Sequence, residues 1–281
     1  MIKKPFTLLF FGLLTMLLAC DSLPVEDKKE DYPILIKRVD IETLKSLNDE
    51  YHQNNNGLIC STLNEYALTG YSRVLFPNDE NPCLSRTESK KEVQYENRFD
   101  DLAKQSLLQN SKFTGVIDAS KLVISEITPL KGCTICEGPD IDNVPLQWKF
   151  EFETQKINNI EVSNTKITVY MDANGVNRIW GNWYNAIDPG FVNFGTNHVK
   201  EYLLGLKLRY ENEQNQIFEQ IVSKEHIKGE PELRFTSVDV EKGMEIHKAW
   251  EVNILLENTD NIKWKVYVST VDGTIIDTTL L

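Results

Sequence analysis

The chain has 281 residues, with 42 acidic and 30 basic side chains and a formal net charge of −12. Nucleic acids and anionic membrane surfaces are bound by clustered lysines and arginines, so this balance argues against both as partners. The length is enough for one large domain or for two to three small ones, each with a core.

The N-terminal residues predict an export signal that ends at a lipid attachment site. Two lysines precede an apolar run, Phe6–Leu18, which is too short to cross a bilayer. The run leads into Leu17-Leu18-Ala19-Cys20, which resembles the lipobox of bacterial lipoproteins. This resemblance implies that residues 1–19 are removed as a lipoprotein signal peptide and that Cys20 carries a diacylglycerol thioether. The alternative is a plain secretory signal with an incidental cysteine.

A lipid on Cys20 would place the protein in the bacterial cell envelope, and we expect the outer membrane or the cell surface. The lipid is the expected contact with the membrane, since a pair of acyl chains attaches a protein stably. Residues 20–33 are predicted to be a flexible tether, because the charged stretch Asp21–Asp31 has too few apolar groups to offset the entropy of ordering.

Residues 34–88 are predicted to form a small N-terminal subdomain. Regular structure should begin near residues 32–36, a short β-branched run, and residues 41–50 have a helical pattern. The rest of this region has no clear periodicity, and it contains two cysteines, Cys60 and Cys83.

Four thiols remain once Cys20 is modified, and an even number in an exported chain favours two disulfides. Three pairings are possible, and proximity in sequence favours Cys60 with Cys83 and Cys133 with Cys136. A redox CxxC needs a thiol of lowered pKa, which the acidic residues after Cys136 oppose. We therefore expect structural disulfides, without a cofactor or a metal. The alternatives are redox chemistry at Cys133 and Cys136, or a metal site made with Cys60 and Cys83.

A first unit of secondary structure is predicted over residues 89–190. Ser89 and Glu92 fit a capping box, and apolar residues then recur at helical spacing to about residue 109. Segments 113–116 and 122–127 look strand-like, and a loop over 131–145 contains the CxxC. From Trp148 onward the pattern predicts β-hairpins, with a turn at Asp172–Gly175.

The same order recurs over residues 195–281. A helical pattern at 197–204 is followed by extended segments at 218–222 and 233–238, and by strands from Trp250 to a turn at Gly273. We therefore predict an α+β fold of two tandem helix-plus-antiparallel-sheet units, each with its own core. Trp148 and Trp250 should open equivalent strands. The alternative is that the chain contains no duplication. The two halves would then look alike only because all β-rich stretches share strand alternation and turn glycines.

Two segments resemble known modules. WKFEFETQKINNIEVSNTKITVYMDANGVNRIWGNW is similar to the propeptide of fungalysin and thermolysin-type metallopeptidases. AWEVNI and WKVYVSTVDGTIID resemble the PepSY module, although the turn Val271-Asp272-Gly273 departs from its usual Thr-Gly. The resemblance implies a freestanding cystatin-like α+β module that inhibits, assists or regulates peptidases, without peptidase activity.

No catalytic or metal-binding residue is predicted. The four histidines form no HExxH pair, and no G-x-S-x-G elbow occurs. Aromatic residues gather at Trp180, Trp183 and Tyr184; core packing explains them most simply, and an exposed one beside a sheet edge would anchor a partner.

We therefore expect a non-enzymatic, lipid-anchored binding or regulatory module whose sheet edge or concave face holds a polypeptide, such as a peptidase. The alternatives are an envelope thiol–disulfide protein using Cys133 and Cys136, and a purely structural lipoprotein.

Overall fold

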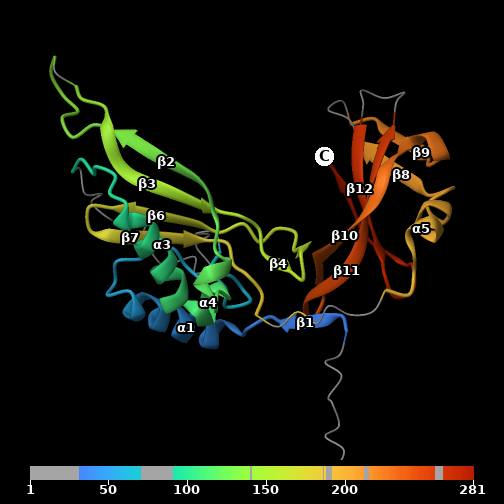
Figure 1. Cartoon of the computed structure of the whole chain (residues 1–281), viewed down its shortest axis with the longest axis horizontal. Coiled ribbons are helices and arrows are strands. Elements are labelled where there is room, and N and C mark those ends of the chain that lie inside the picture. The colour runs from blue at the N-terminus through green and yellow to red at the C-terminus, as the bar shows by residue number, and fades with distance from the viewer. Residues whose placement is uncertain are drawn as a thin grey trace, which may run out of the picture. The chain divides into compact units, whose positions relative to one another are not determined.

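The computed structural model describes residues 32–70, 91–139, 141–185, 187, 192–211, 215–256 and 262–281. In this part of the chain the fold is α+β, with few helices and several antiparallel sheets, as the sequence predicted (Figure 1). The predicted signal peptide, Cys20, Cys83 and most of the tether lie outside the described residues. None of the helices described here is both long and apolar enough to cross a membrane.

The first sheet has four antiparallel strands in the order β2, β3, β6, β7. Their bounds are Ile124–Gly132, Val144–Phe152, Thr168–Asp172 and Gly175–Trp180. Helices α1 (Ile41–Asn54) and α3 (Arg98–Gln109) lie against one face of this sheet (Figure 1). Sheet and helices share one core, whose fully buried side chains include Tyr51, Ala103, Leu107, Phe150 and Phe152.

Short elements complete this part of the molecule. They are the single turn α4 (Ser111–Thr114), the 3-10 turn η1 (Ala119–Lys121) and the hairpin of β4 (Lys156–Ile157) with β5 (Ile160–Glu161). Asn158 and Asn159 between β4 and β5 both have positive φ, 50° and 65°. Asparagine tolerates this conformation, which a tight two-residue hairpin turn requires.

The second sheet is built on the 14-residue strand β11 (Gly243–Leu256). β10 (Ile227–Val240) pairs along one side of β11. The other side is shared: β1 (Ile34–Lys37) pairs with residues 243–246, and β12 (Ile262–Ser269) pairs with residues 249–256. β13 (Ile275–Leu280) adds to β12. No local pattern in residues 32–36 indicates that β1 joins this sheet.

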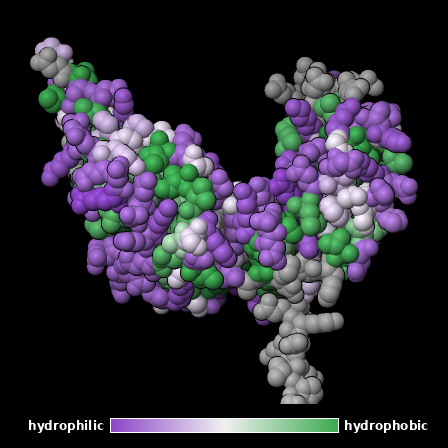
Figure 2. Space-filling model, in the orientation of Figure 1, coloured by the Kyte–Doolittle hydropathy of each residue, from purple (hydrophilic) through white to green (hydrophobic). Residues whose placement is uncertain are grey.

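A second core lies on one face of this sheet. It is covered by α5 (Thr196–Tyr202) and by the hairpin of β8 (Lys207–Glu211) and β9 (Ile217–Ile221); the short turn η2 (Lys224–His226) follows β9. Buried members of the core include Val199, Leu203, Val252, Ile254 and Val266. The face of the molecule seen in Figure 2 is mainly hydrophilic, with scattered apolar groups.

The two sheets repeat the same plan. In each, a helix precedes a meander of four antiparallel strands, although β4 and β5 are inserted between β3 and β6, and β8 and β9 are inserted after α5. Trp148 and Trp250 lie on the second strand of their meanders. Each indole N–H donates to a carbonyl just before the helix, Val93 O at 2.8 Å and Phe194 O at 2.6 Å. The two tryptophans are therefore equivalent, but they lie within their strands and do not open them.

The predicted domain boundaries stay a prediction. Buried side chains from residues 44–63 belong to the core of the first sheet, while β1 extends the second. A third cluster includes Tyr66, Tyr184, Phe235 and Ile246, so it draws on both halves of the chain.

Two predicted elements are wrong in detail. The helix expected from residue 90 begins at Arg98, because the backbone N–H of Val93 donates to Pro145 O at 2.8 Å and the Val93 carbonyl accepts from Trp148. The strand expected at 113–116 is the helical turn α4, which ends where Gly115 adopts a φ of 71°. A short apolar run such as this one does not distinguish a strand from a buried helical turn.

Candidate functional site

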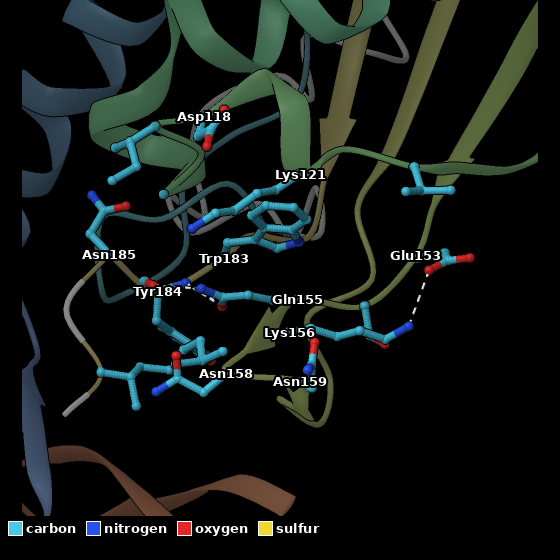
Figure 3. Close-up of a pocket in the computed structure, with 16 residues that line it drawn as sticks. Asp118, Lys121, Glu153, Gln155, Lys156, Asn158, Asn159, Trp183, Tyr184 and Asn185 are labelled. Carbon is cyan, nitrogen blue, oxygen red and sulfur yellow. Dashed lines mark hydrogen bonds and ion pairs between the residues drawn. The ribbon is translucent and has the colours of Figure 1, made fainter. Parts of the chain in front are cut away.

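The candidate site is a cavity of about 610 Å³ at the end of the first sheet, where β2 begins and β3 ends (Figure 3). We call it the Gln155 cavity. Its wall combines apolar, amide and charged side chains. They are Ile117, Val123, Ile157, Trp183, Tyr184 and Ile187; Gln155, Asn158, Asn159 and Asn185; and Asp118, Lys121, Glu153 and Lys156.

A pair of hydrogen bonds joins Gln155 to Tyr184 in the wall of the cavity. The Tyr184 N–H donates to Gln155 Oε1 at 2.9 Å, and Gln155 Nε2 donates to the Tyr184 carbonyl at 2.7 Å. The side-chain amide thus satisfies the backbone of Tyr184 as a neighbouring strand would. Gln155 is buried, and its own N–H donates to the Thr165 hydroxyl at 2.9 Å. Gln155 therefore fixes the backbone at Tyr184.

Trp183 is held by the turn that ends α4. Its N–H donates to Thr114 O at 2.7 Å. A Cβ on Gly115 would lie 1.9 Å from the Trp183 carbonyl oxygen, so this approach requires glycine. The close packing leaves Trp183 only 5% exposed, and the indole belongs to the core of the first sheet.

The predicted aromatic cluster is divided by the structure. Tyr184 is 8% exposed in the third cluster, where burial raises the pKa of its hydroxyl. Trp180 lies outside the cavity, with its ring 4.7 Å from that of Tyr170 and the Arg178 guanidinium 5.6 Å away. Trp183 and Tyr184 therefore reach the cavity wall from their buried positions, and Trp180 does not. Binding of a partner by these three residues stays a prediction.

The mouth of the cavity carries exposed apolar groups, Ile117 at 69% and Val123 at 49%. Two acids and two bases surround them. Lys156 pairs with Glu153 at 3.3 Å, and hydrogen bonds from Ser120 lower the pKa of Asp118. Because these charges balance, the cavity offers apolar contact and amide hydrogen bonds more than attraction for a strongly charged ligand.

The CxxC lies at the far end of the β2–β3 hairpin. Cys133 and Cys136 are disulfide-bonded, with Cα atoms 5.2 Å apart, which confirms the predicted pair. The Asp142 carboxylate accepts from the N–H groups of Thr134 at 2.6 Å and Ile135 at 3.1 Å, and the hydrogen bond from the Thr134 hydroxyl lowers the pKa of Asp142 most. These donors are thus occupied by a carboxylate, and its charge opposes a thiolate in the loop.

Cys60 is buried and also disulfide-bonded. Cys83, its predicted partner, lies outside the described residues. The pairing of Cys60 with Cys83 stays a prediction. Within the described ranges, no three histidine, cysteine or acidic side chains gather closely enough to hold a metal.

Local sequence patterns do not indicate most of the residues that line this cavity. Gln155 and Ile117 lie between regular elements, where periodicity carries no information. Val123 falls in the strand-like segment 122–127, whose pattern indicates a strand and not a binding site. The segment QKINNI at 155–160 falls within the predicted β-rich stretch, and its pattern indicates no role for its amide side chains.

No family model matches this sequence, and a comparison with curated proteins returned no match. Among solved structures, the chain is similar to the Bacillus megaterium YpeB C-terminal domain. The match has 13% sequence identity, covers 70% of this chain and 69% of that one, and has a TM-score of 0.30.

Proposed function

We propose that this protein is a non-enzymatic, lipid-anchored module of the bacterial cell envelope that binds a polypeptide in the Gln155 cavity. One observation supports this most directly: exposed Ile117 and Val123 stand at the mouth of a cavity ringed by three further amide side chains. Apolar groups suit the side chains of a bound peptide, and amides can both donate to and accept from its backbone. The bound polypeptide is a peptidase or another protein that the module holds or regulates.

The test places a photo-cross-linking amino acid at Ile117 in the full-length protein in cells. Polypeptide adducts are expected, and they should be lost when Val123→Asp is added, because a carboxylate would be desolvated on binding. A cross-linker at Val271, which is 37% exposed in the β12–β13 turn, is the matched control. The same adducts at both positions would contradict polypeptide binding in this cavity.

The lipid anchor is tested separately. Mass spectrometry of the mature N-terminus should find a diacylated Cys20, and Cys20→Ser should release the protein from membranes. An unmodified N-terminus at another residue would contradict the anchor and leave the cavity proposal standing.

The alternative of a thiol–disulfide protein is opposed by the Asp142 carboxylate at the CxxC. We expect no insulin reduction by the purified protein with dithiothreitol beyond that of Cys133→Ser/Cys136→Ser. Catalysis that depends on these cysteines would favour the alternative.

A further inference from the structure

A second cavity, of about 570 Å³, lies at the opposite end of the first sheet, between the start of α3 and the β6–β7 turn. We call it the Phe99 cavity. Val93, Phe99 and Met171 are its buried apolar residues, and Leu102 is 40% exposed beside them. None of these residues lines the Gln155 cavity.

The equivalent place in the second sheet is filled by the chain itself. There the N–H groups of Asn193 and Phe194 donate to Thr270 O at 2.8 and 2.9 Å, which ties the segment before α5 to the β12–β13 turn. The Phe194 ring covers that turn so closely that a Cβ on Gly273 would lie 2.8 Å from it. An aromatic side chain thus closes the space between the helix start and the hairpin.

In the first sheet, the aromatic residue of the segment before α3 is Tyr95, whose ring packs on Trp148 and Phe99 at centroid distances of 5.1 and 6.1 Å. Tyr95 does not line the Phe99 cavity. Val93 is the counterpart of Phe194, because its carbonyl accepts the equivalent tryptophan N–H, but its own N–H donates to Pro145 O. Only Ala173 and Asn174 separate the paired residues Asp172 and Gly175, whereas a longer loop follows Ser269 in the second sheet. A Cβ on Gly175 would meet no atom within 4 Å.

The rim of the Phe99 cavity is acidic. Glu96 pairs with Arg98 at 2.6 Å, and Asp172 accepts from Asn177 at 2.8 Å. Glu92 is exposed, and no cation of the described chain pairs with it. The rim therefore has three carboxylates and one guanidinium, which favours a ligand that brings a positive charge.

We propose that the Phe99 cavity binds a polypeptide segment with an aromatic side chain next to a basic residue. The aromatic ring enters between α3 and the β6–β7 turn, as Phe194 does in the second sheet, and the basic residue approaches Glu92. This site is independent of the function proposed for the Gln155 cavity.

The test titrates the full-length protein with the peptide acetyl-Gly-Lys-Phe-Gly-amide and follows backbone and methyl NMR shifts. Perturbations are expected at residues 92–102 and 171–175. The peptide with Ala in place of Phe should bind at least about tenfold more weakly, because it loses the burial of a ring. The peptide with Glu in place of Lys should also bind more weakly.

Matched variants distinguish the effect of the Glu92 charge on binding from a general effect of the substitution on the fold. Glu92→Lys should weaken binding of the Lys-Phe peptide about threefold, within the range of exposed ion pairs. Glu65→Lys, the same charge change at another exposed carboxylate, should leave binding unchanged. Leu102→Ala should weaken binding of the Phe peptide and not that of the Ala peptide.

Equal affinities for the Phe and Ala peptides would overturn the proposal, as would shifts confined to residues outside the Phe99 cavity. Shifts at Gln155 and Trp183 alone would support the first site and reject the second. Peptide-induced shifts at residues 171–175, together with an absence of polypeptide adducts at Ile117, would support the second site and reject the first.

Discussion

Gly115 positions the wall of the Gln155 cavity through a close approach to the backbone of Trp183. Its φ is 71°, and a Cβ there would lie 1.9 Å from the Trp183 carbonyl oxygen. Both the backbone conformation and the space therefore select glycine.

We expect Gly115→Ala to lower the free energy of unfolding by about 2–4 kcal/mol and to abolish cross-linking at Ile117. Gly138→Ala is the matched control, because Gly138 also has a positive φ, 93°, but has no atom within 4 Å of its Cβ position. The control should cost only about 1 kcal/mol. Urea unfolding measures the free energy of unfolding of both variants. Equal decreases in the two variants would contradict a role for the contact with Trp183.

The raised pKa of Tyr66 predicts that the protein loses stability at alkaline pH. Burial, and then the hydrogen bond to Asp239, raise the pKa of Tyr66 to about 12, whereas the ordinary value is 10.0. Since the unfolded chain loses this proton first, the contribution of Tyr66 is complete below pH 10 and is lost as the pH rises toward 12.

Urea unfolding at pH 8 and pH 11 tests this linkage. The wild-type protein should lose more stability between the two pH values than Tyr66→Phe does. Some loss should remain in the variant, because the pKa values of Tyr95 and Tyr267 are also raised to about 12. An identical loss in both proteins would show that Tyr66 titrates normally.

At the scale of elements, β1 is a four-residue strand whose docking depends on one glycine of its partner. β1 pairs with residues 243–246 of β11, and a Cβ on Gly243 would lie 2.2 Å from the Ile36 carbonyl oxygen. The Tyr32 hydroxyl donates to Lys248 O at 3.2 Å just before this strand.

Gly243→Ala should therefore detach β1 and leave the first sheet intact. Hydrogen exchange followed by mass spectrometry should show faster exchange at residues 34–37 and unchanged exchange in β3. Gly195→Ala is the control in the same half of the chain, since its Cβ would have its nearest neighbour, His198, at 4.0 Å. Unchanged exchange at residues 34–37 would refute the steric argument.

At the scale of the whole molecule, the second sheet is completed by segments from the first half. β1 occupies the side of β11 that β12 leaves free, and the Ser163 N–H donates to Phe235 O at 2.8 Å on β10. The third cluster then packs Val162 and Tyr184 against Phe235 and Ile246.

A fragment of residues 195–281 should consequently unfold at lower urea than the full chain and bind a hydrophobic dye, because Met244 and Ile246 lose their cover. Joining residues 32–38 to the start of this fragment through a Gly-Ser linker should restore part of the loss. A fragment without this addition that unfolds as the full chain does would mean that β1 is dispensable.

Local sequence patterns were sufficient for the features whose cause is local. Apolar periodicity placed α1 and α5, turn residues placed the β6–β7 hairpin, and close spacing predicted the Cys133–Cys136 pair. The recurrence of helix and meander was also visible, because strand alternation and turn glycines repeat along the chain.

Tertiary structure alone decided the rest, because distant partners competed with local preference. Val93 gives its backbone groups to Pro145 and Trp148, so α3 starts at Arg98 despite the capping-box pattern. β1 pairs with β11, about 200 residues away. The wall of the Gln155 cavity likewise depends on the side-chain amide of Gln155, which hydrogen-bonds the backbone of Tyr184 as a neighbouring strand would. No periodicity or spacing in the sequence indicates this contact.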